Sequence, residues 1–151
     1  MAIPHGALVL VADGRKVLWL RNQGDSEMLD LRTEAHDERP DPMDGEIKTD
    51  APGTQSPSVG LGHDTMGEAD FHQQGEDRWI RDAAEEVNRR ALTNDFEALV
   101  VVIPPKALGE FRKKLHKEAE RRIVLTINKT MTDRPIPDIE ELLVGEGAPP
   151  A

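Results

Sequence analysis

Residues 7–22 read ALVLVADGRKVLWLRN, and the rest of the chain is arranged around this stretch. Two apolar runs, residues 7–12 and 17–20, meet at Asp13-Gly14, and an Asp-Gly pair between apolar runs predicts a tight β-hairpin. The first run is apolar on both faces, which is typical of a central strand covered from both sides. The second run is expected to place Trp19, Lys16 and Arg21 nearer water. The stretch therefore predicts the nucleus of a β-sheet.

Composition bounds the classes of protein that the chain can belong to. Its 151 residues favour one domain, predicted over residues 1–145 with a disordered tail at 146–151. A formal charge of -10 argues against broad binding to nucleic acid, because affinity for a duplex comes mostly from Lys and Arg at phosphates. The absence of cysteine excludes disulfides, thiolate metal sites and a cysteine nucleophile. Asp13 and Arg15 interrupt the first apolar run, so we expect no signal peptide or membrane span and a cytoplasmic location.

Further elements follow the hairpin in an order that defines the fold class. A third antiparallel strand is predicted around residues 28–33, followed by a long polar loop at 37–67 that is rich in Pro and Gly. This loop is either a functional loop or a disordered insertion. Hydrophobic periodicity then predicts a helix at 70–92, a buried strand at 96–103, a helix from Pro105, a strand at 123–127 and a short helix at 137–144.

These elements predict an α/β fold with a five-stranded mixed sheet. Right-handed crossovers place the strand at 96–103 beside the first strand, which makes the sheet order 3-2-1-4-5 with helices on both faces. The long loop then leaves between the third strand and the first helix. This is the ribonuclease H-like arrangement.

Several motifs resemble the bacterial "protein required for attachment to host cells" family over about residues 7–143. They are VADG, LRN, TDAPG, SVGLG, DFH, LVVVIPPKALGEFRKKL and INKTMTDRPIPDIEELL. That family is similar in fold to the middle domain of the archaeal and eukaryotic peptide-chain release factor, which hydrolyses peptidyl-tRNA. In that domain a loop at the same topological place carries a Gly-Gly-Gln motif. The resemblance therefore implies a role facing the ribosome or RNA.

The loop of this chain departs from that pattern. Residues 58–63 read SVGLGH, and no glycine pair precedes the loop's glutamine, Gln55. The geometry that would orient a water at an ester carbonyl therefore does not carry over. Gly60, Gly62 and His63 remain candidates for close approach to a phosphate or an acyl-tRNA end, with ordinary loop residues as the alternative. The sequence leaves enzymatic activity open and favours its absence.

Two further sets of side chains are candidate ligand sites. Lys129, Thr132 and Arg134 follow the carboxyl end of a parallel strand, where open α/β sheets commonly bind ligands, although a turn and a helix cap explain them equally well. His36, His63 and His72 match no metal-ligand spacing, and surface histidines explain them better. We expect no metal and no cofactor. We assign Asp13 to its hairpin turn.

A basic ridge is predicted along and just after the helix that starts at Pro105. It either contacts RNA phosphates or is a solvated helix face, which the interleaved glutamates favour. Its residues are Lys113, Lys114, Lys117, Arg121 and Arg122.

The function predicted from these features is a non-catalytic module that associates with the ribosome, tRNA or RNA. One alternative is a peptidyl-tRNA or other ester hydrolase that uses the loop at residues 60–63. The other is a component of a surface attachment pathway that binds a protein partner through the loop at 37–67. The sequence makes no prediction of oligomeric state.

Overall fold

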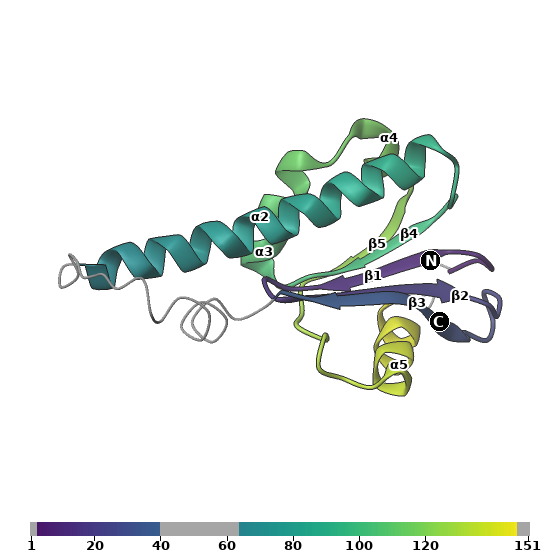
Figure 1. Ribbon diagram of the computed structural model, residues 1–151. Coiled ribbons are helices and arrows are strands. Elements are labelled where there is room, and N and C mark those ends of the chain that lie inside the picture. The colour runs from purple at the N-terminus through teal and green to yellow at the C-terminus, as the bar shows by residue number, and fades with distance from the viewer. Residues whose placement is uncertain (1–2, 40–63, 148–151) are drawn as a thin grey trace.

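The computed structural model describes residues 3–39 and 64–147, with side chains described for 3–39 and 73–146. It contains a five-stranded mixed sheet in the order β3-β2-β1-β4-β5, which confirms the predicted topology (Figure 1). The elements in chain order are β1 (Leu8–Ala12), β2 (Lys16–Asn22), β3 (Leu31–Glu38), α2 (Asp64–Leu92), β4 (Leu99–Val102), α3 (Pro105–Lys114), α4 (Lys117–Glu120), β5 (Ile123–Ile127) and α5 (Ile136–Gly147).

The hairpin at residues 7–22 forms as its sequence predicts, and β1 becomes the centre of the sheet. β1 pairs antiparallel with β2, from Leu8 opposite Arg21 to Ala12 opposite Val17. On its other side β1 pairs in parallel with β4, and β4 in turn with β5. All five residues of β1 are buried, because its alternate side chains point into two different apolar layers.

The two faces of the sheet are covered by different helices. Among the described elements, α2, α3 and α4 lie over one face and α5 lies over the other (Figure 1). The first layer buries Leu8, Leu10 and Phe111 together with the apolar stripe of α2. The second buries Val9 and Val11 against α5. Among the described residues, no helix is long and apolar enough to cross a membrane.

Several element boundaries differ from the sequence prediction. β3 extends to Glu38 and α2 begins at Asp64, so the long connection is shorter than the predicted 37–67. β4 covers Leu99–Val102 and is shorter than the predicted run at 96–103. The short helix α4 was not predicted, and α5 extends past residue 144 to Gly147. Hydrophobic periodicity marks the buried middle of an element better than its polar ends.

The expectation that Trp19 and Arg21 lie near water is wrong. Trp19 is buried, with the guanidinium of Arg90 4.6 Å from its ring centroid. Arg21 donates to Glu34, at 2.9 Å, and to Asp95, at 2.7 Å. The C-terminal part of α2 covers this region, and periodicity within β2 does not reveal a cover from a distant helix.

The same region holds a carboxylate with a strongly lowered pKa. Hydrogen bonds from Arg89 and then Arg90 hold the pKa of Glu86 at about 2. The carboxylate of Glu86 therefore stays ionised far into the acid range, and it remains a charged partner for Arg89 and Arg90.

A buried amide fastens the N-terminal segment to the amino edge of the sheet. Asn22 is fully buried at the end of β2. Its amide nitrogen donates to the carbonyls of Ile3, at 3.2 Å, and Pro4, at 3.1 Å. Its amide oxygen accepts from the backbone N–H groups of Gly24 and Asp30, both at 3.0 Å. One side chain therefore satisfies polar backbone groups on both sides of the turn.

Candidate functional site

The carboxyl edge of the sheet brings together segments that are far apart in the chain. β1, β4 and β5 are parallel, and β3 runs in the same direction because two successive antiparallel pairings relate it to β1. The residues that follow these four strands therefore meet at one edge. In open α/β sheets this edge is where ligands commonly bind.

The turn at residues 13–16 is the centre of this edge. Asp13 Oδ1 accepts hydrogen bonds from the backbone N–H groups of Arg15 and Lys16, each at 2.8 Å, as the hairpin interpretation predicts. Asp13 Oδ2 accepts a third bond, at 2.6 Å, from Oγ1 of Thr132. Thr132 is only 7% exposed, so the hydroxyl end of this bond is shielded from water, whereas Asp13 is half-buried. Asp13 thus joins the first hairpin to the loop after β5.

A second contact joins the same turn and loop. Lys16 Nζ and Asp133 Oδ1 form a hydrogen-bonded ion pair. The hydrogen bond to Asp133 raises the pKa of Lys16, and the same bond lowers the pKa of Asp133. Both groups are solvent-exposed, so this pair adds orientation more than stability.

The end of β3 and the helix α2 also contact this turn. Arg39 donates from its backbone N–H to the carbonyl of Arg15 at 2.6 Å and from Nε to the carbonyl of Gly14 at 3.2 Å. A Cβ atom at Gly14 would lie 2.9 Å from Cβ of Glu76, so α2 packs closely against the turn. A hollow of about 130 Å³ beside it is lined by Gly14, Gln73, Glu76, Asp77, Ile80, Pro104, Lys106 and Ala107.

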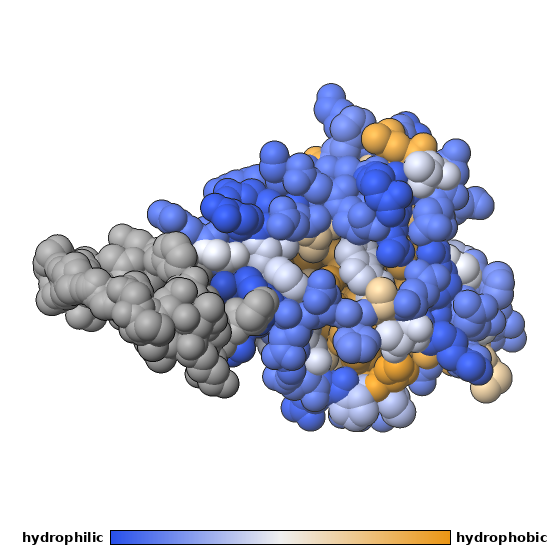
Figure 2. Space-filling view, viewed as in Figure 1, coloured by the Kyte–Doolittle hydropathy of each residue, from blue (hydrophilic) through white to orange (hydrophobic). Residues whose placement is uncertain are grey.

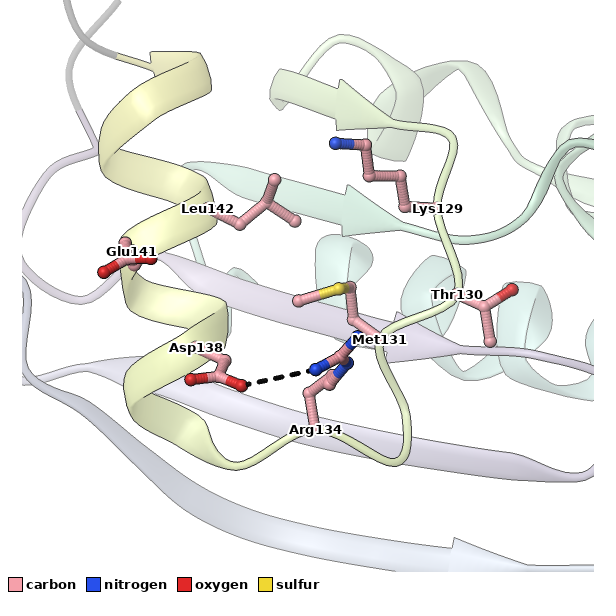
Figure 3. Close-up of a pocket in the computed structure, with 7 residues that line it drawn as sticks. All are labelled: Lys129, Thr130, Met131, Arg134, Asp138, Glu141 and Leu142. Carbon is pink, nitrogen blue, oxygen red and sulfur yellow. Dashed lines mark ion pairs between the residues drawn. The ribbon is translucent and has the colours of Figure 1, made fainter.

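A larger hollow lies between the loop at residues 129–134 and α5. Its volume is about 570 Å³, and it is open to solvent. Figure 3 shows Lys129 and Met131 pointing from the loop toward α5, with Leu142 pointing back from the helix, whereas Thr130 points away. Its lining residues are Lys129, Thr130, Met131, Arg134, Asp138, Glu141 and Leu142.

Cations and apolar side chains share this hollow, which we call the 129–134 hollow. Arg134 is 64% exposed and pairs with Asp138 across a long 3.8 Å. Within the described parts of the chain, no carboxylate lies within ion-pair distance of Lys129. The two predicted cations of this loop therefore point their charge toward solvent or a ligand, while Thr132 between them is used internally.

The predicted basic ridge is less open than its sequence suggests. Arg122 turns inward: it donates to the carbonyl of Phe96 at 2.5 Å and to Asn94 at 2.9 Å. Lys113 pairs with Glu110 and Arg121 with Glu118. Lys114 and Lys117 are exposed. The interleaved glutamates thus neutralise part of this face.

The remaining candidates are placed as follows. Gly60, Gly62 and His63 lie outside the described residues, and so does most of the loop predicted at 37–67. His72 lies within α2, in the part whose side chains are not described. His36 is exposed on β3, as expected for a surface histidine. Across residues 3–39 and 73–146, no three His, Asp or Glu side chains gather as a metal site requires.

Sequence reasoning missed the internal partners of the site. It selected Thr132 as a ligand candidate and assigned Asp13 to its own turn, but it did not connect them. These residues are 119 positions apart, and only the sheet topology brings them together. Asp133 and Asp138 were also missed, because an acidic residue in a polar loop or on a helix surface carries no signal of its own.

Replacing Thr132 with valine should lower the free energy of unfolding by about 1.5–3 kcal/mol, because a partly buried hydrogen bond to a charged group is lost. Urea denaturation measures this change. Thr130→Val is the matched control, since Thr130 is exposed and should change stability by less than about 0.5 kcal/mol. Equal midpoints for the two variants would show that the bond to Asp13 does not stabilise the fold.

Comparison with known protein families finds one match that covers almost the whole chain. The family model described as bacterial archaeo-eukaryotic release factor family 12 matches residues 6–143. These residues include the complete sheet and the loop at 129–134. Comparison with curated proteins finds no match.

Proposed function

The chain belongs to bacterial archaeo-eukaryotic release factor family 12, and from this premise we propose that it is a non-catalytic module that binds RNA. The RNA is ribosomal RNA or tRNA, and it contacts the carboxyl edge of the sheet. The observation that carries this proposal is the loop at residues 129–134. It presents two exposed cations from a backbone that Asp13 and Lys16 hold in place.

The electrostatic argument favours this loop over the basic ridge. Phosphate contacts supply most of the affinity of proteins for nucleic acid, and they require cations that are not already neutralised. On the ridge, Lys113 and Arg121 have glutamate partners and Arg122 is internal, which leaves Lys114 and Lys117 exposed beside the glutamates that interleave this face. At the loop, Lys129 has no partner among the described residues and Arg134 has only a distant one. An acidic chain then needs only a local patch of cations to bind RNA.

The fixed geometry of the loop is the second argument. A flexible loop that becomes ordered on binding loses conformational entropy, and this loss reduces the affinity. A loop that is already ordered before binding avoids this cost. Thr132 and Asp133 each hold the loop to the turn at 13–16, one from a buried position and one at the surface. The cations on either side are thereby presented in a defined arrangement.

The absence of a Gly-Gly-Gln motif supports a non-catalytic role. The residues that would replace it, at 58–63, lie outside the described part of the chain. Hydrolysis of peptidyl-tRNA and participation in host attachment are therefore alternative functions that experiment has to test.

A pair of charge reversals tests the proposal. Lys129→Glu/Arg134→Glu should weaken binding to ribosomes and to tRNA at least about tenfold at low salt, because two phosphate contacts become repulsive. The slope of log K against log salt should fall by about two. Co-sedimentation with ribosomes and fluorescence anisotropy with labelled tRNA measure these changes.

Lys114→Glu/Lys117→Glu is the matched control, since it changes the net charge by the same amount on the basic ridge. It should alter the affinity less than about threefold, as expected for long-range charge alone. Stronger loss in the ridge variant would move the RNA contact to the ridge. Absence of the unmodified protein from ribosomal fractions and from tRNA at low salt would overturn the proposal and favour a protein-binding role.

A further inference from the structure

We propose that the 129–134 hollow binds one unpaired nucleotide of RNA and that its preferred base is guanine. This inference rests on the proposed function, since it specifies the part of the RNA that is recognised. It concerns base selection, whereas the proposed function concerns phosphate contacts. The two are therefore separable by experiment.

The apolar wall of the hollow suits the face of a base. Met131 on the loop and Leu142 on α5 point toward one another across the opening (Figure 3). Both are half-buried against the second core layer, so their positions are set by packing. Figure 2 shows hydrophobic residues reaching the surface over α5, on a face that is otherwise mostly hydrophilic. Apolar side chains of this kind hold an unstacked base by contact with its ring faces.

Two cations of the lining are available to the backbone of such a nucleotide. Lys129 and Arg134 lie on the same loop as Met131, one on each side of it in sequence. A base against Met131 with its Watson–Crick edge toward Asp138 has its sugar and phosphate on the side of Lys129, and Arg134 is then left for the phosphate of a neighbouring nucleotide (Figure 3). Arg134 is free to turn toward a phosphate because its pairing with Asp138 is long, at 3.8 Å.

Asp138 is the group that selects the base. Its side chain is 48% exposed in the hollow and pairs only loosely with Arg134, so its carboxylate retains acceptor capacity. Guanine presents two adjacent donors, N1–H and the N2 amino group, on its Watson–Crick edge. A carboxylate accepts both at once, and paired hydrogen bonds to a charged group are strong. Adenine, cytosine and uracil present no such adjacent pair of donors.

The size of the hollow limits it to a small part of the RNA. A volume of about 570 Å³ is within the range of about 300–1,000 Å³ that small-molecule sites occupy. Because the hollow is open, the neighbouring nucleotides can continue outside it. A duplex does not fit this arrangement, since its bases are already paired and stacked. The ligand is therefore a nucleotide in a loop, a bulge or a single-stranded end.

Fluorescence anisotropy with short oligonucleotides tests the inference. The probes are labelled 12-nucleotide oligouridines with one central guanosine, adenosine or cytidine, and the all-uridine strand. We expect the guanosine strand to bind on the order of tenfold more tightly than the all-uridine strand, as one bidentate contact to a base provides. The adenosine and cytidine strands should bind within about threefold of the all-uridine strand.

Two variants of α5 locate the selectivity. Asp138→Asn removes the carboxylate and should abolish the guanosine preference while all-uridine binding stays the same or rises. Glu146→Gln removes the same charge from an exposed position at the end of α5, and it should leave the preference unchanged. Thermal unfolding of both variants verifies that each remains folded at the assay temperature.

Each outcome decides the inference. Equal binding of all four strands overturns it but leaves the proposed function standing, because phosphate contacts do not distinguish bases. A guanosine preference that survives in Asp138→Asn overturns the assignment of the hollow. If no strand binds, the guanine inference is overturned as well. If the protein also binds neither ribosomes nor tRNA, the proposed function is overturned.

Discussion

Replacing Asn22 with aspartate should lower the free energy of unfolding by about 3–5 kcal/mol at pH 7. The carboxylate has the shape of the amide but no N–H donors. The carbonyls of Ile3 and Pro4 would lose their hydrogen bonds and face a negative charge. Because position 22 is fully buried, water cannot compensate. Urea denaturation monitored by circular dichroism measures the loss, which is a large part of the stability of a typical domain.

The defect of Asn22→Asp should depend on pH in a defined direction. Burial and the neighbouring carbonyls raise the pKa of the introduced carboxyl above its value in the unfolded chain. The folded state then binds the proton more tightly, so the relative stability of the variant is greatest below about pH 4 and falls as the pH rises through the folded pKa. Urea denaturation of Asn22→Asp and of the unmodified protein at several pH values measures this trend.

Asn128→Asp is the matched control, since Asn128 is exposed after β5. The same chemical change there should alter the free energy of unfolding by less than about 0.5 kcal/mol at each pH measured. A pH-independent loss in Asn22→Asp would contradict the interpretation that a buried charge causes the defect.

Replacing Gly24 with alanine should cost about 3 kcal/mol, because the turn after β2 leaves no room for a side chain. A Cβ atom there would overlap the carbonyl oxygen of Met28 and lie 2.9 Å from the backbone nitrogen of Asp30. The obstruction is backbone, which cannot move aside as a flexible side chain can. The midpoint of thermal unfolding should fall by several degrees.

Gly109→Ala is the comparison that isolates this steric effect. Gly109 lies within α3, and a Cβ atom there meets nothing within 4 Å. Because alanine favours the helix more than glycine does, this variant should gain about 0.5–1 kcal/mol. Loss of stability in both variants would indicate that removal of glycine, and not crowding at position 24, determines the effect.

Much of the fold could be predicted from the sequence because its decisive signals are local. The pair Asp13-Gly14 between two apolar runs specifies the first hairpin without reference to the rest of the chain. The run at 99–103 is apolar at every position, as a strand buried on both faces requires. Once these elements were placed, the handedness of crossovers left few sheet orders to consider.

The features that could not be predicted arise from contacts between distant segments. Trp19 is buried because it packs into the apolar layer under α2, where Arg90 lies over its ring, and Arg122 is internal because it reaches the carbonyl of Phe96. The candidate site shows the same division. The position of Lys129, Thr132 and Arg134 at the end of a parallel strand was predictable from strand order. The use of Thr132 by Asp13 was not, since it depends on the distance between two loops.

The turn at residues 13–16 has a consequence for how this protein tolerates mutation. Three other parts of the chain meet it: Arg39 after β3, Glu76 on α2, and Thr132 and Asp133 after β5. Residues that share partners in this way have effects on stability that do not add. A substitution in one of these segments therefore changes the effect on stability of substitutions in the others. Sequence divergence at this junction should therefore be epistatic, with acceptable changes occurring in sets rather than singly.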